Sequence, residues 1–399
     1  MPGLKTFLGQ KTALAESYII ETRRYLHSIP ELGMQEQRTS AFIKDELVKM
    51  GYTPVCGIAN TGITADLQFA GPGPCLMIRA DMDALPMEEQ TGLPFASTHP
   101  GCMHACGHDG HVAMVLGAAR VMSELAAGSE GKNLRGSIRF LFQPAEEAPG
   151  GAEPMIKEGV LDGVDACLAC HIWPQVPQGH VGVKPGPLMA AMDRFEIILK
   201  GRGGHSSQPH LCTDVLGAAA ELALALPREA GNRINPVLPA VLSICKLSAG
   251  HTFNVIPQTA ALSGCTRAFH KEVCQMWEDE ISRVTDGIAK ACGVEYKFNY
   301  LPGHGAVDND PEVTSFVRDA VACVLGEDKV FTPELSLAGE DFSCFQEVVP
   351  GCMFFLGSGV EGCKPLHSPE FSFNEKILAK GTGVFCQAAL NLLASFKAE

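Results

Sequence analysis

The sequence predicts an α/β fold, in which one domain has a mostly parallel sheet and a smaller α+β domain is inserted into it. Apolar runs of strand length alternate with segments whose Leu, Ile, Tyr and Phe residues repeat at helical spacing. Glycine-rich loops follow the runs, and this alternation is typical of parallel strands joined by helices. The expected strands are 75–80, 138–142, 166–170 and 353–356, and the expected helices are 11–28, 36–50, 110–127 and 374–396.

A second pattern occupies about 188–301. Pro185-Gly-Pro187 precedes this segment and Pro302-Gly303 follows it, and such Pro/Gly clusters mark boundaries. We therefore expect one domain made of 1–187 and 302–399, with 188–301 as the insertion. The elements expected within the insertion are strands at 195–200, 240–247 and 260–268 and helices at 214–226 and 272–292.

The composition describes a globular chain that is long enough for two domains. It has 399 residues, of which 46% are hydrophobic, and a net charge of -14 without any basic run, which excludes a nucleic-acid surface. No apolar stretch approaches the roughly 20 residues that span a bilayer, and the N-terminus lacks a signal-peptide pattern. We expect a cytoplasmic protein without a membrane partner. Its 16 cysteines should then be reduced thiols, most of them buried as small hydrophobes, such as Cys245 and Cys386.

The densest chemical signal is Met103-His-Ala-Cys-Gly-His-Asp-Gly-His111, at the start of an expected helix. Imidazole and thiolate are preferred ligands of zinc and similar ions. Cys106 and His108 are two residues apart in a turn, so both can face one ion. The alternative is a polar loop that caps the helix through Asp109, but so many metal-binding side chains in one loop favour a metal site.

Carboxylates follow two of the expected strands. Asp81 and Asp83 follow the first, where they can orient a metal-bound histidine, although an ordinary turn has the same composition. Glu146 and Glu147 follow the second. Adjacent carboxylates suit a divided task, in which one binds a metal and the other accepts a proton from the metal's water. A solvated acidic surface remains the alternative for this pair.

The segment Cys167-Leu-Ala-Cys170-His171 spells the pattern of covalent c-type haem attachment. It lies in an expected buried strand rather than in a loop, so we interpret His171, at the strand's end, as a metal ligand. His367 lies in the loop 365–369. It is unremarkable alone, but the other candidate ligands make it a candidate metal ligand as well. One of the two glutamates then completes a set of five ligands, which exceeds one tetrahedral site and suits two ions that share a bridge.

Other catalytic chemistries lack their motifs. The chain has no G-x-S-x-G elbow, no phosphate-binding G-x-x-x-x-G-K-[ST] loop and no G-x-G-x-x-G after a strand. A cysteine nucleophile at Cys106 would leave Glu146 and Glu147 without a task. The residues therefore favour a metal-dependent hydrolase.

These motifs, in this order, resemble the amidohydrolase branch of the co-catalytic aminoacylase and carboxypeptidase family. That branch holds hippurate hydrolases, aminoacylases and plant auxin-conjugate hydrolases. The likeness covers nearly the whole chain. It rests on Arg24-Tyr-Leu-His27, Pro30-Glu-Leu32, Arg79-Ala-Asp-Met-Asp-Ala-Leu-Pro86, Met103–Asp109, Gln143-Pro-Ala-Glu-Glu147, His171-Ile-Trp-Pro174, Gly203-Gly-His-Ser-Ser-Gln-Pro-His210, Phe253-Asn-Val-Ile-Pro257, Gly339-Glu-Asp-Phe342 and His367-Ser-Pro-Glu-Phe371.

The resemblance implies a role for each candidate residue. Glu146 is the expected general base. Asp81 and Asp83 are expected to contact the metal ligands rather than the metal. In other branches the position of Asp81 carries a histidine ligand, but this branch has an aspartate there. The expected contacts with substrate and oxyanion are His205, Asn254 and Arg267, of which the last two would otherwise be interpreted as a turn and a solvated strand end. The expected metal ligands are Cys106, which is shared between two ions, His108, Glu147, His171 and His367.

The resemblance also implies the activity. The chain is expected to use two divalent ions (Zn, Mn, Co or Ni) to hydrolyse the amide bond of a small acylated amino acid. The inserted domain is expected to be a dimerisation or lid domain, in a homodimer or homotetramer. A dipeptidase or aminopeptidase with the same metal chemistry is the close alternative, and a haem or thiol-redox protein is the distant one.

Overall fold

The computed structural model describes residues 2–395, and its alternating helices and strands confirm the predicted α/β fold. The chain forms two compact units. The first contains the described residues of 2–186, 308–334 and 341–395, and the second contains 187–307 and 335–340. The second unit therefore includes a short segment, 335–340, that the Pro/Gly boundaries do not signal.

An eight-stranded sheet organises the described part of the first unit, in the order β1-β2-β4-β3-β5-β16-β6-β15. The central strands β4, β3, β5 and β16 pair in parallel, whereas β1, β2 and β6 each run antiparallel to a neighbour. The four predicted strands are these central ones, which read as apolar runs because both faces are covered. The bounds are β1 Val55–Ile58, β2 Gly62–Gln68, β3 Cys75–Asp81, β4 Ser137–Gln143, β5 Ala166–Pro177, β6 Val181–Gly182, β15 Val330–Phe331 and β16 Gly351–Gly359.

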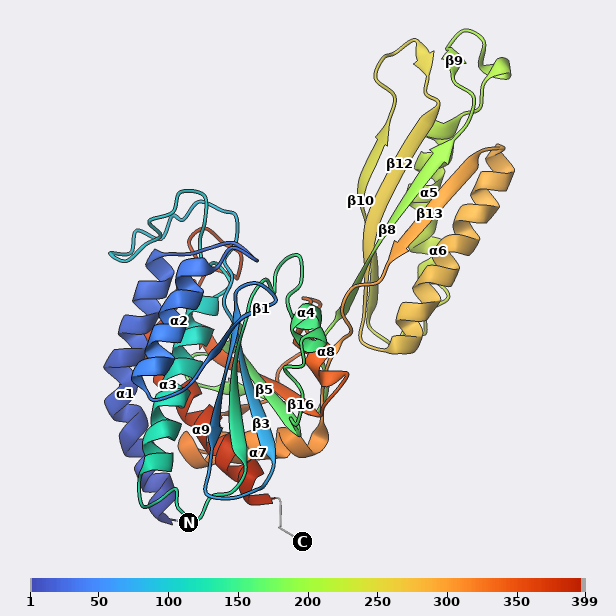
Figure 1. Cartoon of the computed structure of the whole chain (residues 1–399). Helices are drawn as coiled ribbons and strands as arrows, with labels where there is room; N and C mark the ends of the chain where they lie inside the picture. Colours follow the sequence, from blue (N-terminus) through green and yellow to red (C-terminus); the bar gives the residue numbers. More distant parts are fainter. Residues whose placement is uncertain (1, 396–399) are drawn as a thin grey trace. The chain divides into compact units, whose positions relative to one another are not determined.

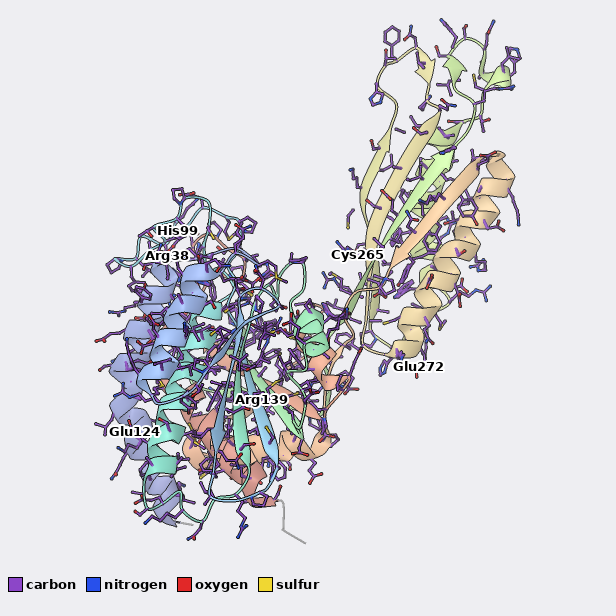
Figure 2. All side chains as sticks on the ribbon, in the orientation of Figure 1. Arg38, His99, Glu124, Arg139, Cys265 and Glu272 are labelled. Atoms are coloured by element: carbon purple, nitrogen blue, oxygen red, sulfur yellow. The ribbon has the colours of Figure 1, made fainter. Side chains whose placement is uncertain are left out.

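An ion pair ties the antiparallel strand β2 to the parallel part of the sheet. Arg139 of β4, labelled in Figure 2, is in register with Asp66 of β2 and donates to both of its carboxylate oxygens, each at 2.8 Å. The same guanidinium donates to the carbonyl oxygens of Val160 and Asp162. Sequence patterns did not predict β1, which is short and mostly exposed, or β2, which is partly exposed.

Helices cover the first unit's sheet (Figure 1). α3 is buried along most of its length and packs against α1 and α9. α1 begins at Pro2, well before the predicted start at 11, because Leu4, Phe7 and Leu8 extend its apolar face onto the core. The bounds are α1 Pro2–Ser28, α2 Gln37–Lys49, α3 His108–Ala127, α4 Ala152–Lys157, α7 Pro311–Val324, α8 Phe342–Gln346 and α9 Leu378–Ser395, with short 3₁₀ turns at Glu327–Lys329 and Glu375–Ile377.

The last helix corrects one expectation from the sequence. Glu375–Ser395 is long and apolar enough to cross a membrane, although no such stretch was expected. However, 78% of its apolar window is buried inside the protein, where Val384, Phe385 and Leu392 belong to the main hydrophobic core. Its apolar character is that of a core helix.

The second unit is built on a four-stranded antiparallel sheet, in the order β10-β12-β8-β13. α5 and α6 pack on one face, and side chains of β12 alternate accordingly, with Ala260 and Leu262 buried beneath the helices. The strand β13 was not predicted. The bounds are β8 Ala191–Lys200, β10 Ala240–Ala249, β12 Thr259–Ala268, β13 Glu295–Leu301, α5 Val215–Gly231 and α6 Lys271–Cys292, with short elements β7 Gly186–Met189, β9 Gly204–His205, β11 Val255–Ile256, β14 Val307–Asn309 and a 3₁₀ turn at Pro209–Leu211.

The cysteines are only partly as expected. All are free and Cys386 is buried, but Cys245 is exposed on the edge strand β10. Cys167 and Cys170 lie three residues apart on β5, so their side chains point to opposite faces of the sheet and cannot both bond to one haem. Because β5 continues to Pro177, His171 lies within the strand rather than at its end.

Candidate metal centre

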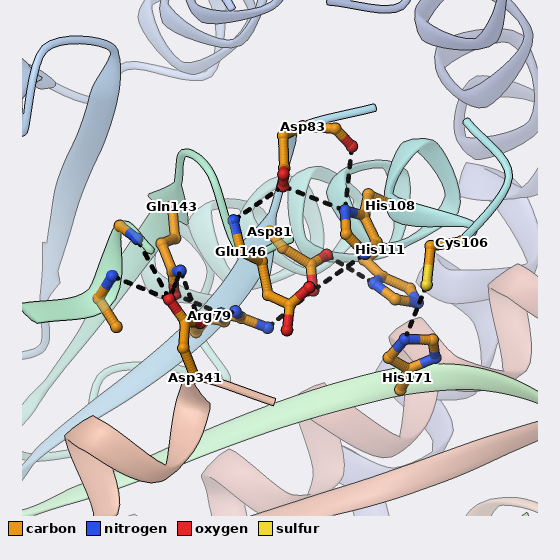
Figure 3. Close-up of polar contacts among 12 residues, drawn as sticks. Arg79, Asp81, Asp83, Cys106, His108, His111, Gln143, Glu146, His171 and Asp341 are labelled. Carbon is orange, nitrogen blue, oxygen red and sulfur yellow. Dashed lines mark hydrogen bonds and ion pairs between the residues drawn. The ribbon is translucent and has the colours of Figure 1, made fainter. Parts of the chain in front are cut away.

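Parallel strands bring acidic and imidazole side chains to one edge of the first unit's sheet (Figure 3). β3 ends at Asp81, in register with Gln143 at the end of β4. The chain continues to Asp83 after β3 and to Glu146 after β4, while the neighbouring strand β5 carries His171. The carboxyl ends of parallel strands are where such sheets place functional groups. Strand pairing therefore gathers residues that are far apart in the sequence.

The Cys106 thiol lies at the centre of this group. Its Sγ is 3.5 Å from Nε2 of His171 and 3.3 Å from Nε2 of His367, which in turn is 2.9 Å from Oε1 of Glu147. The ligand atoms of Cys106, His108 and His171 lie within 4.8 Å of one another, as do those of Cys106, Glu147 and His367. All five predicted ligands are thus together, and Cys106 belongs to both groups.

Backbone carbonyls fix the orientation of two imidazoles. Nδ1 of His171 donates to the carbonyl oxygen of Ile172 at 2.8 Å, and Nδ1 of His108 donates to that of Asp83 at 3.0 Å. Assigned from these bonds, the Nε2 lone pairs face the cluster. Nε2 of His108 is buried and has no hydrogen-bond partner among the described residues. A buried imidazole nitrogen without a hydrogen-bond partner fits a bound cation.

Asp83 connects this histidine to the two glutamates. Its Oδ1 and Oδ2 accept the backbone N–H groups of Glu146 and Glu147 at 3.0 and 3.1 Å. Oδ1 also lies 3.3 Å from Nδ1 of His108. One carboxylate therefore positions both glutamates and one predicted ligand, as expected of a group behind a metal site.

Asp81 orients a histidine that had no predicted role. Its Oδ1 accepts from Nδ1 of His111 at 2.6 Å, and Nε2 of His111 accepts the N–H of Ile172 at 2.9 Å. Burial alone would raise the pKa of Asp81, but His108, His111 and the Arg79 guanidinium lower it well below its ordinary value. The sequence did contain a signal, because histidines three residues apart share one face of a helix.

A buried polar network surrounds Arg79. Its Nε donates to Oε1 of Gln143 at 2.9 Å, and its Nη2 lies 3.1 Å from Oδ1 of Asp341. Asp341 also accepts the N–H groups of Gly151 and Ala152, where α4 begins. Removing one partner of such a buried pair typically costs about 3–5 kcal/mol. The family motif includes Asp341, but sequence reasoning gave it no task.

A second charged network holds the start of α3. Asp109 does not cap the helix; its Oδ2 lies 2.7 Å from Nε of Arg23 and 2.8 Å from Nδ1 of His27. His27 also lies 3.2 Å from Glu89. His104 is buried nearby, and its ring nitrogens have no hydrogen-bond partner in the described part of the chain. Burial lowers its pKa to about 3, so its ring is neutral. Arg23 and Glu89 were not singled out in the sequence, and His27 and His104 lie in the quoted motifs but were given no role.

The electrostatics of the cluster favour a cation. Burial and the carboxylates of Glu147 and Glu146 raise the pKa of the Cys106 thiol well above its ordinary value. Burial would lower the pKa of His108, but the carboxylates around it raise that pKa to about 10. Negative charge from the carboxylates contributes to both shifts. A divalent ion would balance this charge and deprotonate the thiol.

Residues 77–391 of the chain match peptidase family M20/M25/M40. The chain belongs to this family. It is 40% identical over 380 residues to the N-acetyl-L-cysteine deacetylase of Bacillus subtilis (strain 168). The aligned residues cover 95% of this chain and 89% of that relative. It is also 40% identical over 295 residues to the N-acyl-L-amino acid amidohydrolase of Geobacillus stearothermophilus. This alignment covers 74% of this chain and 78% of that relative.

Solved structures agree with this assignment. A dinuclear metal-binding peptidase of the M20 family from Bacillus subtilis is 36% identical to this chain and superposes with a TM-score of 0.85. The alignment covers 96% of this chain and 99% of that structure. The family predicted from the motifs and the predicted fold are therefore confirmed.

Two of the predicted substrate contacts of this M20 chain lie together in the second unit. His205 on β9 pairs with β11, and the N–H of Ser206 donates to the carbonyl oxygen of Asn254 at 3.1 Å. The N–H and hydroxyl of Ser207 lie 3.2 and 2.8 Å from Nδ1 of His205. Because that backbone N–H can only donate, Nδ1 is an acceptor and the neutral ring carries its proton on Nε2.

Arg267 lies far from this pair in the same unit. β9 follows Lys200, which pairs with Thr259 at one end of β12, whereas Arg267 is near the other end (Figure 1). At about 3.3 Å per residue, the strand separates Thr259 from Arg267 by roughly 25 Å. The structure thus groups His205 with Asn254 but not with Arg267, whose guanidinium bonds to the carbonyl oxygen of Leu337.

Replacing Asp83 tests whether the cluster holds metal in the way its contacts indicate. Asp83→Asn keeps the size of the side chain but removes one acceptor, so one glutamate N–H loses its bond. We expect about 10–100-fold weaker binding of zinc to chelator-treated protein, measured by titration calorimetry. Asp66→Asn, at the exposed ion pair on β2, is the control. Unchanged zinc affinity in Asp83→Asn would contradict this role.

Proposed function

We propose that the chain is a metal-dependent amidohydrolase that cleaves the amide bond of N-acyl amino acids. The observation that carries this proposal is the pair of adjacent carboxylates Glu146 and Glu147 beside the Cys106 thiol, of which Glu147 contacts His367. The names of the two relatives, a deacetylase and an amidohydrolase of N-acyl amino acids, support this substrate class. A cytoplasmic location, without nucleic-acid or membrane partners, stays a prediction.

The five clustered side chains fit two divalent ions. Cys106 would be shared, with His108 and His171 on one side and Glu147 and His367 on the other. The mixture of sulfur, nitrogen and oxygen ligands is compatible with Zn, Mn, Co or Ni. Such ions would polarise the amide carbonyl and lower the pKa of water towards neutrality.

We assign proton transfer to Glu146. Its carboxylate takes a proton from the attacking water and delivers it to the nitrogen of the leaving amine. The hydrogen bond from its backbone N–H to Asp83 fixes the backbone position from which the Glu146 side chain extends. His205 is suited to the oxyanion, because its Nε2–H is a donor that can bond to the developing negative charge.

We further infer that the substrate is held by two copies of the chain. One second unit cannot present both His205 and Arg267 to one small substrate, since roughly 25 Å of strand lies between their ends of the sheet. His205 is exposed, and the neighbouring Phe253 is 96% exposed, as expected of a surface that meets another molecule. A homodimer, or a homotetramer built from such dimers, would bring the two groups together, with the second unit as the dimerisation domain.

A substrate comparison tests the class of reaction. N-acetyl and N-benzoyl amino acids are offered beside dipeptides with a free amine, and the released amino acid is measured with the metal-loaded protein. We expect the acylated compounds to have the higher kcat/KM. A preference for the free amine would instead indicate a dipeptidase or aminopeptidase with the same metal chemistry.

Removing the carboxylate of Glu146 tests its role as the base. Glu146→Gln should bind the wild-type amount of metal, measured by elemental analysis, while turnover falls by about 10²–10⁴-fold because the amide cannot accept the proton. Glu153→Gln, at an exposed position of α4, is the matched control and should keep its activity. Turnover near the wild-type value in Glu146→Gln would rule out this assignment.

Mixing two inactive variants tests whether the site is shared. Glu146→Gln and His205→Ala chains are dissociated together and reassociated, so that a mixed dimer has one site with both native groups. Random pairing should restore about a quarter of the wild-type activity, since half of the dimers are mixed and each has one complete site. Each variant reassociated with itself is the control. If native mass spectrometry shows mixed dimers but activity stays absent, His205 does not act across the interface.

A further inference from the structure

The second unit carries two cysteines that are diagonal neighbours on adjacent strands. Cys265 of β12 is opposite Ser243 of β10, and Cys245 follows two residues later on the same strand as Ser243. Residues two apart on a strand share a face, so both thiols lie on the face of the sheet opposite α5 and α6. The register shifts between Ile244 and Lys246, which marks a β-bulge at Cys245. A bulge increases the local twist, which brings one diagonal pair closer.

The two thiols are neighbours and differ in exposure. Cys245 and the guanidinium of Arg267, which lies two residues further along β12, both act electrostatically on the Cys265 thiol. Cys245 is exposed, whereas Cys265 (labelled in Figure 2) is half-buried. Burial, and then the contact with Cys245, raises the pKa of Cys265 although Arg267 lowers it. Cys245 is therefore the thiol that a reagent in solution reaches first.

We propose that Cys245 and Cys265 form a redox modification site, which reacts with a hydroperoxide and closes to a disulfide within one chain. β10 is an edge strand, so one side of Cys245 faces no neighbouring strand of this sheet. Other thiols lack this combination. Cys167 and Cys352 lie on the paired strands β5 and β16, but both are completely buried. In reducing compartments, disulfides of this kind are usually transient and redox-sensing.

The reaction balances with the hydroperoxide as oxidant. The Cys245 thiolate attacks one oxygen of hydrogen peroxide, the O–O bond breaks, and hydroxide leaves and takes up a proton to form water. The resulting sulfenic acid is attacked by the Cys265 thiolate, which forms the S–S bond and releases the second hydroxide as water. Two electrons pass from the sulfurs to the peroxide, and the two thiol protons end in the two water molecules.

The disulfide would also change the surroundings of Arg267. Reaction draws the Cys265 sulfur towards Cys245 and removes a titratable thiol that interacts with the guanidinium. This consequence rests on the proposed function, in which Arg267 contacts the substrate. Oxidation should then raise KM more than it lowers kcat, because Arg267 is proposed to bind the substrate and is not one of the metal ligands.

Peptide mapping tests the site without reference to activity. Zinc-loaded protein is treated with a slight excess of hydrogen peroxide, digested without reductant and examined by mass spectrometry. We expect a peptide that joins Cys245 to Cys265, with the mass of two hydrogen atoms lost, and its disappearance after dithiothreitol. In Cys265→Ser, Cys245 should instead be trapped by dimedone as the sulfenic acid. Cys56→Ser, at another exposed cysteine, is the matched control and should still form the joined peptide.

Peroxide that modifies Cys56 but leaves Cys245 and Cys265 reduced would overturn the proposal. The activity arm is separate: KM for an acylated amino acid should rise severalfold on oxidation of the wild type, recover with dithiothreitol and stay constant in Cys245→Ser. A disulfide without a change in KM would overturn the link to Arg267. A protein without amidohydrolase activity would contradict the proposed function instead, since the mapping requires no substrate.

Discussion

The position of β3 between β4 and β5 is the constraint on which the metal centre depends. These three strands are parallel, so their carboxyl ends meet at one edge. Asp81 and Asp83, the two glutamates and His171 come together there for that reason alone. The loop that carries Cys106 and the start of α3 then close over the same edge, and His367 is attached to it by a bond from its N–H to the carbonyl oxygen of Ala105.

This edge is both buried and strongly charged, and the fold offsets the cost of burial with hydrogen bonds. Arg79 is satisfied by Asp81, Gln143 and Asp341, and Asp83 is satisfied by two backbone N–H groups. Satisfied groups of this kind hold their neighbours in one geometry. The ligand atoms at the centre lie mainly against one another, and Nε2 of His108 has no hydrogen-bond partner among the described residues, which is the pattern of a site completed by an ion.

Much of this could be predicted from the sequence, because the signals are local. The buried strands are unbroken apolar runs, and Cys106 and His108 stand in a loop dense in metal-binding side chains. The roles of His205 and Arg267 came only from the family resemblance, since a histidine in a glycine-rich turn and an arginine at a strand end are ordinary.

Other features could not be predicted, because they depend on contacts between distant segments. Asp341 joins the Arg79 network although the two residues are far apart in the sequence. Residues 335–340 belong to the second unit, although the preceding segment 308–334 belongs to the first. Cys245 reads as a buried residue in an apolar run, but a bulge on an edge strand exposes it. The partner of Asp81 was missed because His111 was one of three histidines in the segment 103–111, and spacing alone did not assign its role.

The separation of His205 from Arg267 along one sheet has a thermodynamic consequence. A substrate that touches His205 of one copy and Arg267 of another binds only the associated state, so by mass action it stabilises that association. Occupancy of the site and the strength of the subunit contact are then linked quantities. In the proposed assembly of two copies, the subunit contact would be weakest when substrate is scarce, and each substrate molecule that binds would strengthen the contact on which its own hydrolysis depends.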